Sequence, residues 1–291
     1  MLTKMIRLTV SVDSKLKDFI SDFLLGLDAQ GVSEEKPDEK MVNITALFTQ
    51  YTDTDNIIEK LCEFGKILKD KESGQTPFEI TVDHVDRSYW EVWRSFLKTI
   101  RVSPRIIIYP PWEPPEIKNG DIALEINPSM AFGTGHHETT RLCLRSIEQI
   151  CEENDIESLI DIGCGSGVLG IAAVRMGISN IIAMDNDLLA VKETLSNMSV
   201  NGVSEKFIYF CGTPDNLSGV RADIVVANIT TGPILKMKSN LRTIMKDKGY
   251  LVLSGIPLTG KEEILSGIKT EGFKLEDIKA EGDWIALIFR Q

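Results

Sequence analysis

The chain has few of the residues that build metal sites and disulfide frameworks. Of its 291 residues, five are cysteine and three are histidine. Two of the histidines, His136 and His137, are adjacent, so they lack the i, i+4 spacing of a helical zinc site. No CxxC pair occurs among the cysteines, which stand at positions 62, 143, 151, 164 and 211. We therefore expect reduced thiols in a cytosolic setting, and no bound metal.

Long apolar runs and a surplus of basic residues are also missing. No stretch reaches the roughly 20 uncharged apolar residues of a membrane span, and the opening MLTKMIRLTV lacks the apolar centre of a secretion signal. Lys and Arg number 32 against 43 Asp and Glu, for a net charge of −11. Because affinity for a phosphate backbone comes largely from Lys and Arg, we expect no direct nucleic-acid binding. Because no apolar span is present, we expect no membrane association. The charge favours a basic protein partner, although acidity can also serve solubility alone.

Hydrophobic patterning divides the first part of the chain into a small domain and a linker. Residues 1–85 alternate strand-like runs with helical stripes, and an extra strand near 31–33 completes the order βαββαβ. This order predicts an α+β, ferredoxin-like domain. Residues 86–120 contain a Trp-rich stretch and then four prolines in the six positions 110–115, which disfavour a regular helix or a central strand. We interpret this segment as an inter-domain linker.

Residues 121–291 have a different hydrophobic pattern. Apolar runs such as SLIDIG, NIIAMD, ADIVVANI and GYLVLSGI alternate with helical patterns of ten or more residues. This alternation is typical of a parallel sheet with crossover helices, so we expect a doubly wound α/β domain. The closing run KLEDIKAEGDWIALIF predicts two strands joined at a Gly-Asp turn, which form an antiparallel hairpin at the sheet edge.

A glycine-rich turn in this domain predicts a nucleotide-like cofactor. In SLIDIGCGSGVLGIAA the strand carries Asp161 and leads through Gly163 and Gly165 into a helical pattern. Closely spaced glycines let the backbone approach a ligand, and the helix that follows offers free N–H groups. Asp185 stands 22 residues after Gly163, at the end of the next strand. An acidic side chain there can accept hydrogen bonds from both hydroxyls of a ribose.

The identity of the cofactor depends on Asp161. Gly165, Gly167 and Gly170 also satisfy the GxGxxG pattern of dinucleotide-binding folds, so an NAD oxidoreductase is one alternative. A carboxylate next to the loop is poorly placed beside a pyrophosphate and well placed near a cationic ligand without phosphate. S-adenosylmethionine, with its sulfonium and ammonium groups, is such a ligand. A glycine-rich turn without any ligand is the remaining alternative.

Two further segments flank the expected pocket. The run ADIVVANI ends at Asn228, whose side-chain carbonyl could orient an incoming amine, although a strand-end asparagine can also simply make a turn. The decapeptide AFGTGHHETT, residues 131–140, precedes a helical pattern and contains no GxxxxGK[ST] phosphate loop. We interpret it as a cofactor clamp in which Phe132 and Gly133 approach the ligand and a threonine hydroxyl bonds it. A histidine base is an alternative role.

Together these segments resemble the PrmA family, the S-adenosylmethionine-dependent methyltransferases of large-subunit ribosomal protein L-11. The resemblance covers residues 86–291 and is carried by DRSYWEVWRSF, RIIIYPPWE, NPSMAFGTGHHETTRLCL, DIGCGSGVLGIAA, MDND, ADIVVANI and LVLSGI. It implies a seven-stranded, Rossmann-like methyltransferase domain. It also implies methyl transfer to lysine or α-amino groups, with substrate recognition by the N-terminal domain and cofactor contacts from Thr140, Gly163, Asp185 and Asn228.

The substrate is less firmly indicated than the chemistry, because residues 1–85 carry no distinctive motif. A methyltransferase of the same fold that acts on another protein lysine, or on a small amine or acid, would keep every motif above. A non-catalytic binder is a further alternative, which the complete set of glycine loop, Asp185 and Asn228 disfavours.

Overall fold

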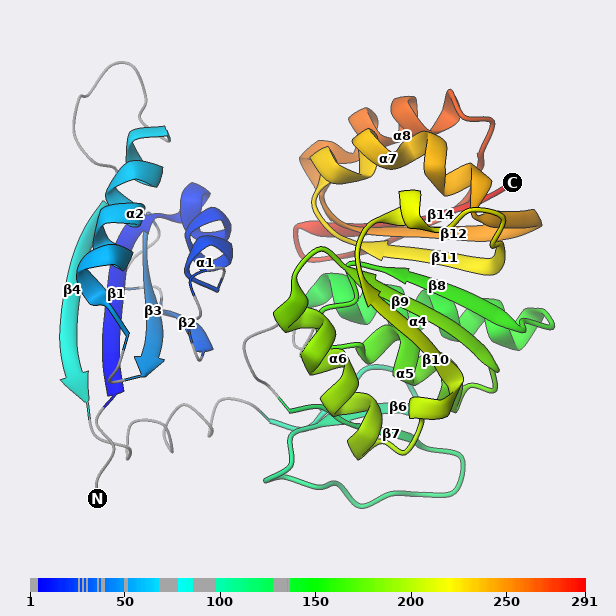
Figure 1. The fold of residues 1–291 in the computed structure, drawn as a ribbon, viewed down its shortest axis with the longest axis horizontal. Helices are drawn as coiled ribbons and strands as arrows, with labels where there is room; N and C mark the ends of the chain where they lie inside the picture. The colour runs from blue at the N-terminus through cyan, green and yellow to red at the C-terminus, as the bar shows by residue number, and fades with distance from the viewer. Residues whose placement is uncertain are drawn as a thin grey trace. The chain divides into compact units, whose positions relative to one another are not determined.

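In the computed structural model the chain forms two compact units, Met1–Leu97 and Lys98–Gln291 (Figure 1). The structure describes residues 5–25, 27, 29, 31–35, 37, 40–49, 52–67, 78–85, 98–127, 135 and 137–291.

The smaller unit contains a four-stranded sheet in which every neighbouring pair of strands is antiparallel, in the order β2-β3-β1-β4. In β1 every second side chain is buried, because alternate residues of a strand point to opposite faces of the sheet. The buried face packs against two helices, and the elements follow in the predicted order βαββαβ. The elements are β1 Met5–Asp13, η1 Ser14–Leu16, α1 Lys17–Leu25, β2 Gly31–Glu35, β3 Met41–Thr49, α2 Thr54–Ile67 and β4 Phe78–Val85.

The larger unit is built on a seven-stranded sheet with the order β10-β9-β8-β11-β12-β14-β13. All neighbouring strands are parallel except β14, which runs antiparallel to both β12 and β13. The predicted α/β domain and its closing hairpin are therefore confirmed. The strands are β8 Ser158–Ile162, β9 Asn180–Asp185, β10 Phe207–Cys211, β11 Ala222–Asn228, β12 Met245–Pro257, β13 Lys274–Glu281 and β14 Trp284–Arg290.

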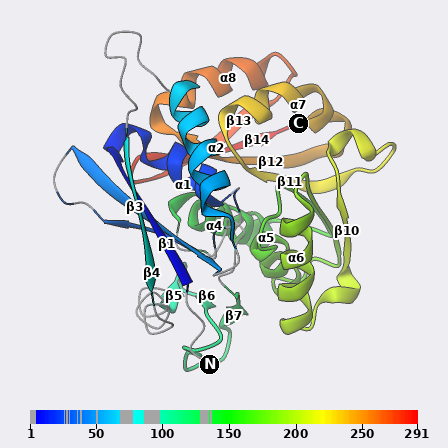
Figure 2. The same ribbon diagram turned by 60° about the vertical axis from the view of Figure 1, so that its left-hand side comes forward.

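Helices cover both faces of this sheet and enclose two hydrophobic cores (Figure 1, Figure 2). In β11, Ile224 and Val226 face the core under α4, α5 and α6, whereas Val225 and Ala227 face the core under α7 and α8. Because both faces are buried, the strands read as continuous apolar runs. The helices are α4 Glu138–Glu153, α5 Val168–Arg175, α6 Leu188–Val200, α7 Thr231–Thr243 and α8 Lys261–Lys269, with the short η2 Ser204–Lys206, η3 Pro214–Asn216 and η4 Leu258–Gly260.

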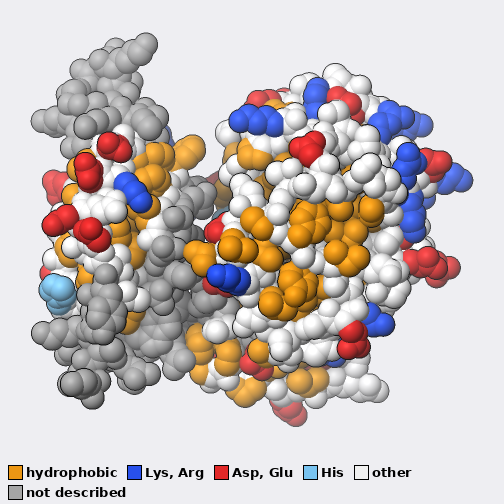
Figure 3. Space-filling view, in the orientation of Figure 1, with side chains coloured by type: hydrophobic (Ala, Val, Ile, Leu, Met, Phe, Trp, Pro, Cys, Tyr) orange, Lys and Arg blue, Asp and Glu red, His pale blue; other side chains and the backbone are white. Residues whose placement is uncertain are grey.

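One edge of the large sheet is less completely covered. The fully described connection between β10 and β11 contains the three-residue η3 and no longer helix. As a result Ile208, on the edge strand β10, is 64% exposed. Separately, Leu188 and Leu195 of α6 are exposed. Figure 3 shows hydrophobic side chains across the middle of the visible face of this unit.

Part of the predicted linker belongs to a third, three-stranded sheet. Strands β5 Ile100–Arg101, β6 Ile106–Tyr109 and β7 Ile122–Glu125 pair in the order β5-β6-β7. Ile106 and Ile108 are buried in the same core as α4, so residues 98–120 belong to the larger unit. The prediction of a linker over 86–120 is wrong for this segment because the cluster of four prolines begins only after β6 has ended at Tyr109. Residues 86–97 lie outside the described residues.

No helix in the described part of the chain is long and apolar enough to cross a membrane. All five cysteines are free, as their spacing predicts.

Candidate functional site

The predicted site residues meet at the carboxyl ends of three neighbouring strands. Strand β8 lies between β9 and β11: the chain continues from β8 to β9 and β10 on one side of it, and then crosses to β11 and β12 on the other side. In open α/β sheets a ligand crevice forms at such a switch point. Asp161 lies in β8, Asp185 ends β9 and Asn228 ends β11. The fold therefore brings together side chains that are up to 67 positions apart in the sequence.

The glycine loop between β8 and α5 needs glycine for two reasons. Gly163 has a φ of 72°, which lies in the left-handed region that other residues rarely adopt. A Cβ atom at this position would also lie 2.5 Å from Cγ2 of Ile229, the residue that follows Asn228. The backbone N–H of Gly163 donates to the carbonyl oxygen of Met184 at 2.8 Å. The loop is thus held against the ends of β9 and β11, and its backbone lies at the switch point of the sheet.

Asp185 reaches across to this loop. Its Oδ2 accepts a hydrogen bond from the backbone N–H of Gly165 at 3.1 Å, and its Oδ1 accepts one from Asp187 at 3.0 Å. Each oxygen of an ionised carboxylate can accept a second hydrogen bond. The carboxylate is therefore fixed beside the loop and retains acceptor capacity for two ligand hydroxyls, and its role as a ribose contact stays a prediction.

Asp161 is the most unusual group of the site. The side chain is fully buried, and among the described residues neither carboxylate oxygen has a hydrogen-bond partner. Burial, and next the charge of Asp185, raise the pKa of Asp161 to about 7, against a smaller lowering effect of the backbone N–H of Gly170. Buried polar groups are normally paired, and an unpaired buried carboxylate is costly. A cationic ligand near Asp161 would stabilise its ionised form, so this residue fits a sulfonium- and ammonium-bearing molecule.

Two thiols share these surroundings. Cys143 of α4 and Cys164 of the glycine loop are both buried, and burial together with the nearby charge of Asp161 raises the pKa of each thiol. The hydroxyl of Thr194 donates to the sulfur of Cys164 at 3.2 Å. Both cysteines are therefore protonated, inert side chains at neutral pH rather than nucleophiles.

Asn228 is 8% exposed and is joined to the first turn of α4. Its Nδ2 donates a hydrogen bond to Oγ1 of Thr140 at 3.3 Å, whereas its Oδ1 has no partner among the described residues. Thr140 itself is fully buried. The sequence predicts both residues for the site but not this bond, because 88 positions separate them. An acceptor atom without a partner among the described residues is thus present at the end of β11.

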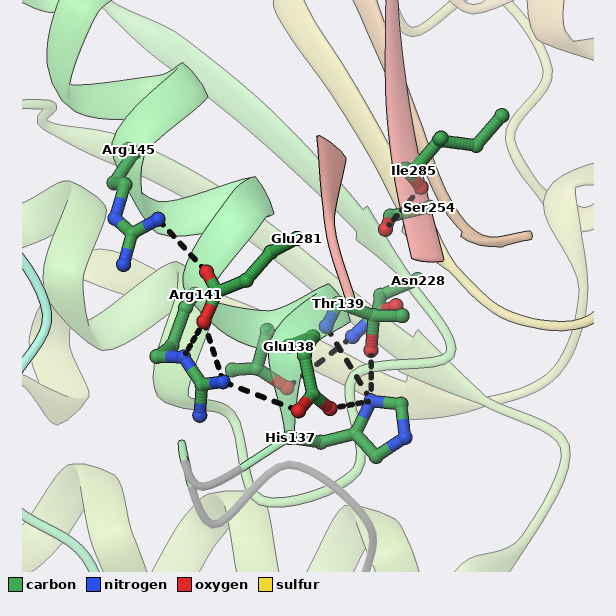
Figure 4. Close-up of polar contacts among 10 residues, drawn as sticks. His137, Glu138, Thr139, Arg141, Arg145, Asn228, Ser254, Glu281 and Ile285 are labelled. Carbon is green, nitrogen blue, oxygen red and sulfur yellow. Dashed lines mark hydrogen bonds and ion pairs between the residues drawn. The ribbon is translucent and has the colours of Figure 1, made fainter. Parts of the chain in front are cut away.

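The decapeptide 131–140 is described only in part. Phe132, Gly133 and His136 lie outside the described residues, so their roles stay predictions. His137 precedes α4 and caps it: its Nδ1 accepts from the backbone N–H of Thr139 at 3.3 Å (Figure 4). The ring also meets the edge of Trp284 with 4.9 Å between ring centroids. With Nδ1 engaged, this geometry favours a structural role for His137 over the alternative of a base.

An ion-pair network anchors α4 to the closing hairpin. The two oxygens of Glu281, the last residue of β13, accept from Arg141 Nε and Arg145 Nη1, each at 2.8 Å (Figure 4). Burial alone would favour the neutral acid, but the hydrogen bonds and charges of the two arginines outweigh it and hold the pKa of Glu281 below its usual range. This network, which no local sequence pattern predicts, fixes the helix that carries Thr140.

Comparisons with known proteins agree with this geometry. The sequence profile of the family described as "Ribosomal protein L11 methyltransferase (PrmA)" matches residues 4–291. A ribosomal protein L11 methyltransferase of Caldanaerobacter subterraneus subsp. tengcongensis is 30% identical, with 99% of each chain covered. One of Pelobacter propionicus is 29% identical, with 100% of this chain and 99% of the relative covered. A crystal structure of ribosomal protein L11 methylase from Lactobacillus delbrueckii subsp. bulgaricus is 25% identical, with a TM-score of 0.62 over 66% of this chain and 97% of that one.

Proposed function

This chain belongs to the ribosomal protein L11 methyltransferase (PrmA) family, and we propose that it transfers methyl groups from S-adenosylmethionine to lysine or N-terminal amino groups of ribosomal protein L11. The names of its relatives point to the substrate. The observation that best supports the donor is the fully buried carboxylate of Asp161, which has no hydrogen-bond partner among the described residues and lies beside a glycine loop at the switch point of the sheet. No dinucleotide pyrophosphate would be favourably placed next to it.

Three groups of the chain would hold the donor. The glycine loop, where a Cβ at Gly163 would collide with Ile229, lets the backbone approach the ligand closely. Asp185, already fixed by Gly165 and Asp187, accepts hydrogen bonds from the ribose hydroxyls. Asp161 offers its negative charge to the cationic end of the ligand. When bound, S-adenosylmethionine supplies an electrophilic methyl group on a sulfonium.

Asn228 would orient the methyl acceptor. Its Oδ1 accepts an N–H of the neutral amine, so that the nitrogen lone pair faces the methyl carbon. The nitrogen–carbon bond then forms as the carbon–sulfur bond breaks, and S-adenosylhomocysteine and a proton leave. No covalent enzyme intermediate is required. Positioning and the exclusion of water supply most of the catalysis, and we assign no general base.

The charge of the chain supports a basic protein substrate. Residues 1–97 contain 12 Lys and Arg against 18 Asp and Glu, whereas the twice longer remainder contains 20 against 25. The acidic excess is therefore concentrated in the smaller unit, which we propose recognises the substrate. A ribosomal protein substrate also agrees with the cytoplasmic location that the cysteine usage predicts.

The substrate is tested by mass spectrometry. The enzyme is incubated with a methyl-labelled donor and either purified L11 or the whole lysate of cells that lack this enzyme. We expect label on amino groups of purified L11, and we expect L11 to be the main labelled protein in the lysate. Label on another protein, or on small molecules alone, would assign the same chemistry to a different acceptor. Binding of NAD but not of S-adenosylhomocysteine would contradict the donor.

A further inference from the structure

Two adjacent threonines open α4, and their hydroxyls have different partners. Thr139 and Thr140 are both fully buried. Oγ1 of Thr139 lies 2.8 Å from Nδ1 of His137, within the cap of the helix. Oγ1 of Thr140 instead accepts from Nδ2 of Asn228 at 3.3 Å. The two threonines are adjacent and equally buried, but their contacts differ. Among the described residues, Thr139 contacts the helix cap and Thr140 contacts Asn228 of the proposed acceptor site.

The contact matters because a side-chain amide has two ends of nearly equal size and opposite hydrogen-bonding character. In Asn228 the donor end is held by Thr140, and the acceptor end has no partner among the described residues. A rotation of the amide by half a turn would exchange the two, and the Thr140 hydroxyl would then have to donate to Oδ1 instead of accepting from Nδ2. The NH₂ group would then face the N–H groups of an incoming amine, and no acceptor would be left to orient its lone pair.

Both partners stand on rigid parts of the fold. Asn228 ends a central strand, and the backbone N–H of the next residue, Ile229, donates to the carbonyl oxygen of Ser254 at 3.1 Å. Thr140 lies in the helix that Glu281 fixes to the closing hairpin through two arginines. A hydrogen bond between rigid elements can hold an orientation more closely than one from a mobile loop.

We propose that Thr140 is a positioning residue, whose hydroxyl holds the amide of Asn228 so that Oδ1 is directed at the methyl acceptor. The proposal rests on the methyl transfer proposed above. It gives Thr140 a different role from the direct cofactor contact that the family resemblance implies. The Thr140 side chain orients the Asn228 amide, and the Asn228 amide in turn orients the amine.

Kinetics of matched threonine variants test this role. Thr140→Val removes the hydroxyl and keeps the branched shape, and we expect kcat to fall about tenfold while the donor Kd stays within about twofold. Thr140→Ser, which retains the hydroxyl, should restore most of kcat. Thr139→Val is the control: it weakens the helix cap and lowers thermal stability, but kcat should change less than about twofold. An unchanged kcat in Thr140→Val, or equal losses in kcat and donor affinity, would overturn the proposal.

A double-mutant cycle separates action through Asn228 from an independent effect. In the Asn228→Ala background, Thr140→Val should cause no further loss of kcat, since the group it positions is gone. If the fold-losses of kcat in the two single variants multiply in the double variant, the residues act independently and the proposal is contradicted. Thermal unfolding of all four proteins reports whether a loss of activity merely follows a loss of folded enzyme.

A measurement without substrate keeps this question apart from the proposed function. The two side-chain N–H resonances of Asn228 can be assigned by NMR from their disappearance in Asn228→Ala. Thr140→Val should shift the hydrogen-bonded proton upfield, and Thr139→Val should leave it in place. If the wild-type enzyme methylates no L11 but shows this pattern, the proposed function is refuted while the Thr140–Asn228 hydrogen bond is supported. If Thr140→Val leaves the resonances unchanged, the positioning role fails.

Discussion

Asp161 and Asp185 lie on neighbouring strands, and the charge of Asp185 adds to the effect of burial on the pKa of Asp161. The pKa of the carboxyl rises from its ordinary value of 3.8 to about 7. A cation bound beside Asp161 would favour ionisation and reverse part of that rise. The site therefore carries an electrostatic cost in the free protein that a bound cationic ligand would relieve.

This relationship predicts opposite effects of Asp161→Asn on stability and on binding. A raised pKa means that the folded chain holds a proton more tightly than the unfolded chain, so wild-type stability falls as pH rises from about 4 to 7. The neutral variant avoids this loss, which is at most about 4 kcal/mol. Its melting temperature should exceed that of wild type at pH 8 by more than at pH 5, and it should bind S-adenosylmethionine more weakly at pH 8.

Thermal unfolding and calorimetry at the two pH values check this prediction. The exposed Asp155→Asn serves as the control and should change neither quantity. An equal stability difference at pH 5 and pH 8 would show that Asp161 does not titrate in this range.

Asp185→Ala should weaken donor binding by about 10- to 100-fold, because the ribose hydroxyls lose a charged acceptor. Asp187→Ala is a matched control two positions away. Its Oδ1 accepts from the backbone N–H of Leu189 at 2.8 Å and caps α6, so the variant should lose stability and keep donor affinity. Calorimetric titration measures both. Equal affinity for wild type and Asp185→Ala would remove the ribose role.

Gly163→Ala should be more harmful than alanine at another glycine with positive φ. Gly177 has a φ of 105° but open space around a Cβ, so Gly177→Ala reports backbone strain alone, about 1–2 kcal/mol. At Gly163 the clash with Ile229 adds about 1–3 kcal/mol and displaces the loop from the donor. Urea unfolding and donor titration compare the two variants. Equal destabilisation of both would mean that the loop tolerates the added methyl group.

Glu281→Gln should lower stability at neutral pH by about 1 kcal/mol, which corresponds to a few degrees in melting temperature. Since the pKa of Glu281 lies below its ordinary value of 4.5, the ionised carboxylate stabilises the fold above that pH, and its contribution is lost as pH falls through the lowered pKa. The difference from wild type should therefore be full at pH 7 and shrink in acid. Exposed Glu276→Gln on the same strand is the control. A constant difference at all pH values would contradict the ion-pair account.

The parts of the site that follow from local patterns could be predicted from the sequence. The glycine turn, Asp185 and Asn228 each end a strand-like run, and parallel strands necessarily bring such ends to one edge of a sheet. The ion pairs of Glu281 could not be predicted in this way, because they join segments 136 and 140 positions apart and depend on how α4 packs on the sheet. Strand β6 could not be predicted either, because it is only four residues long and directly precedes the proline cluster.

The most direct test of the account is transfer of a labelled methyl group to purified L11 by wild type and Asn228→Ala, both saturated with donor, in a single turnover. We predict label on amino groups of L11 with wild type, and a loss of rate in the variant that exceeds its loss of donor affinity. A wild-type enzyme that binds S-adenosylmethionine but leaves L11 unlabelled would contradict the account, as would a variant that transfers at the wild-type rate.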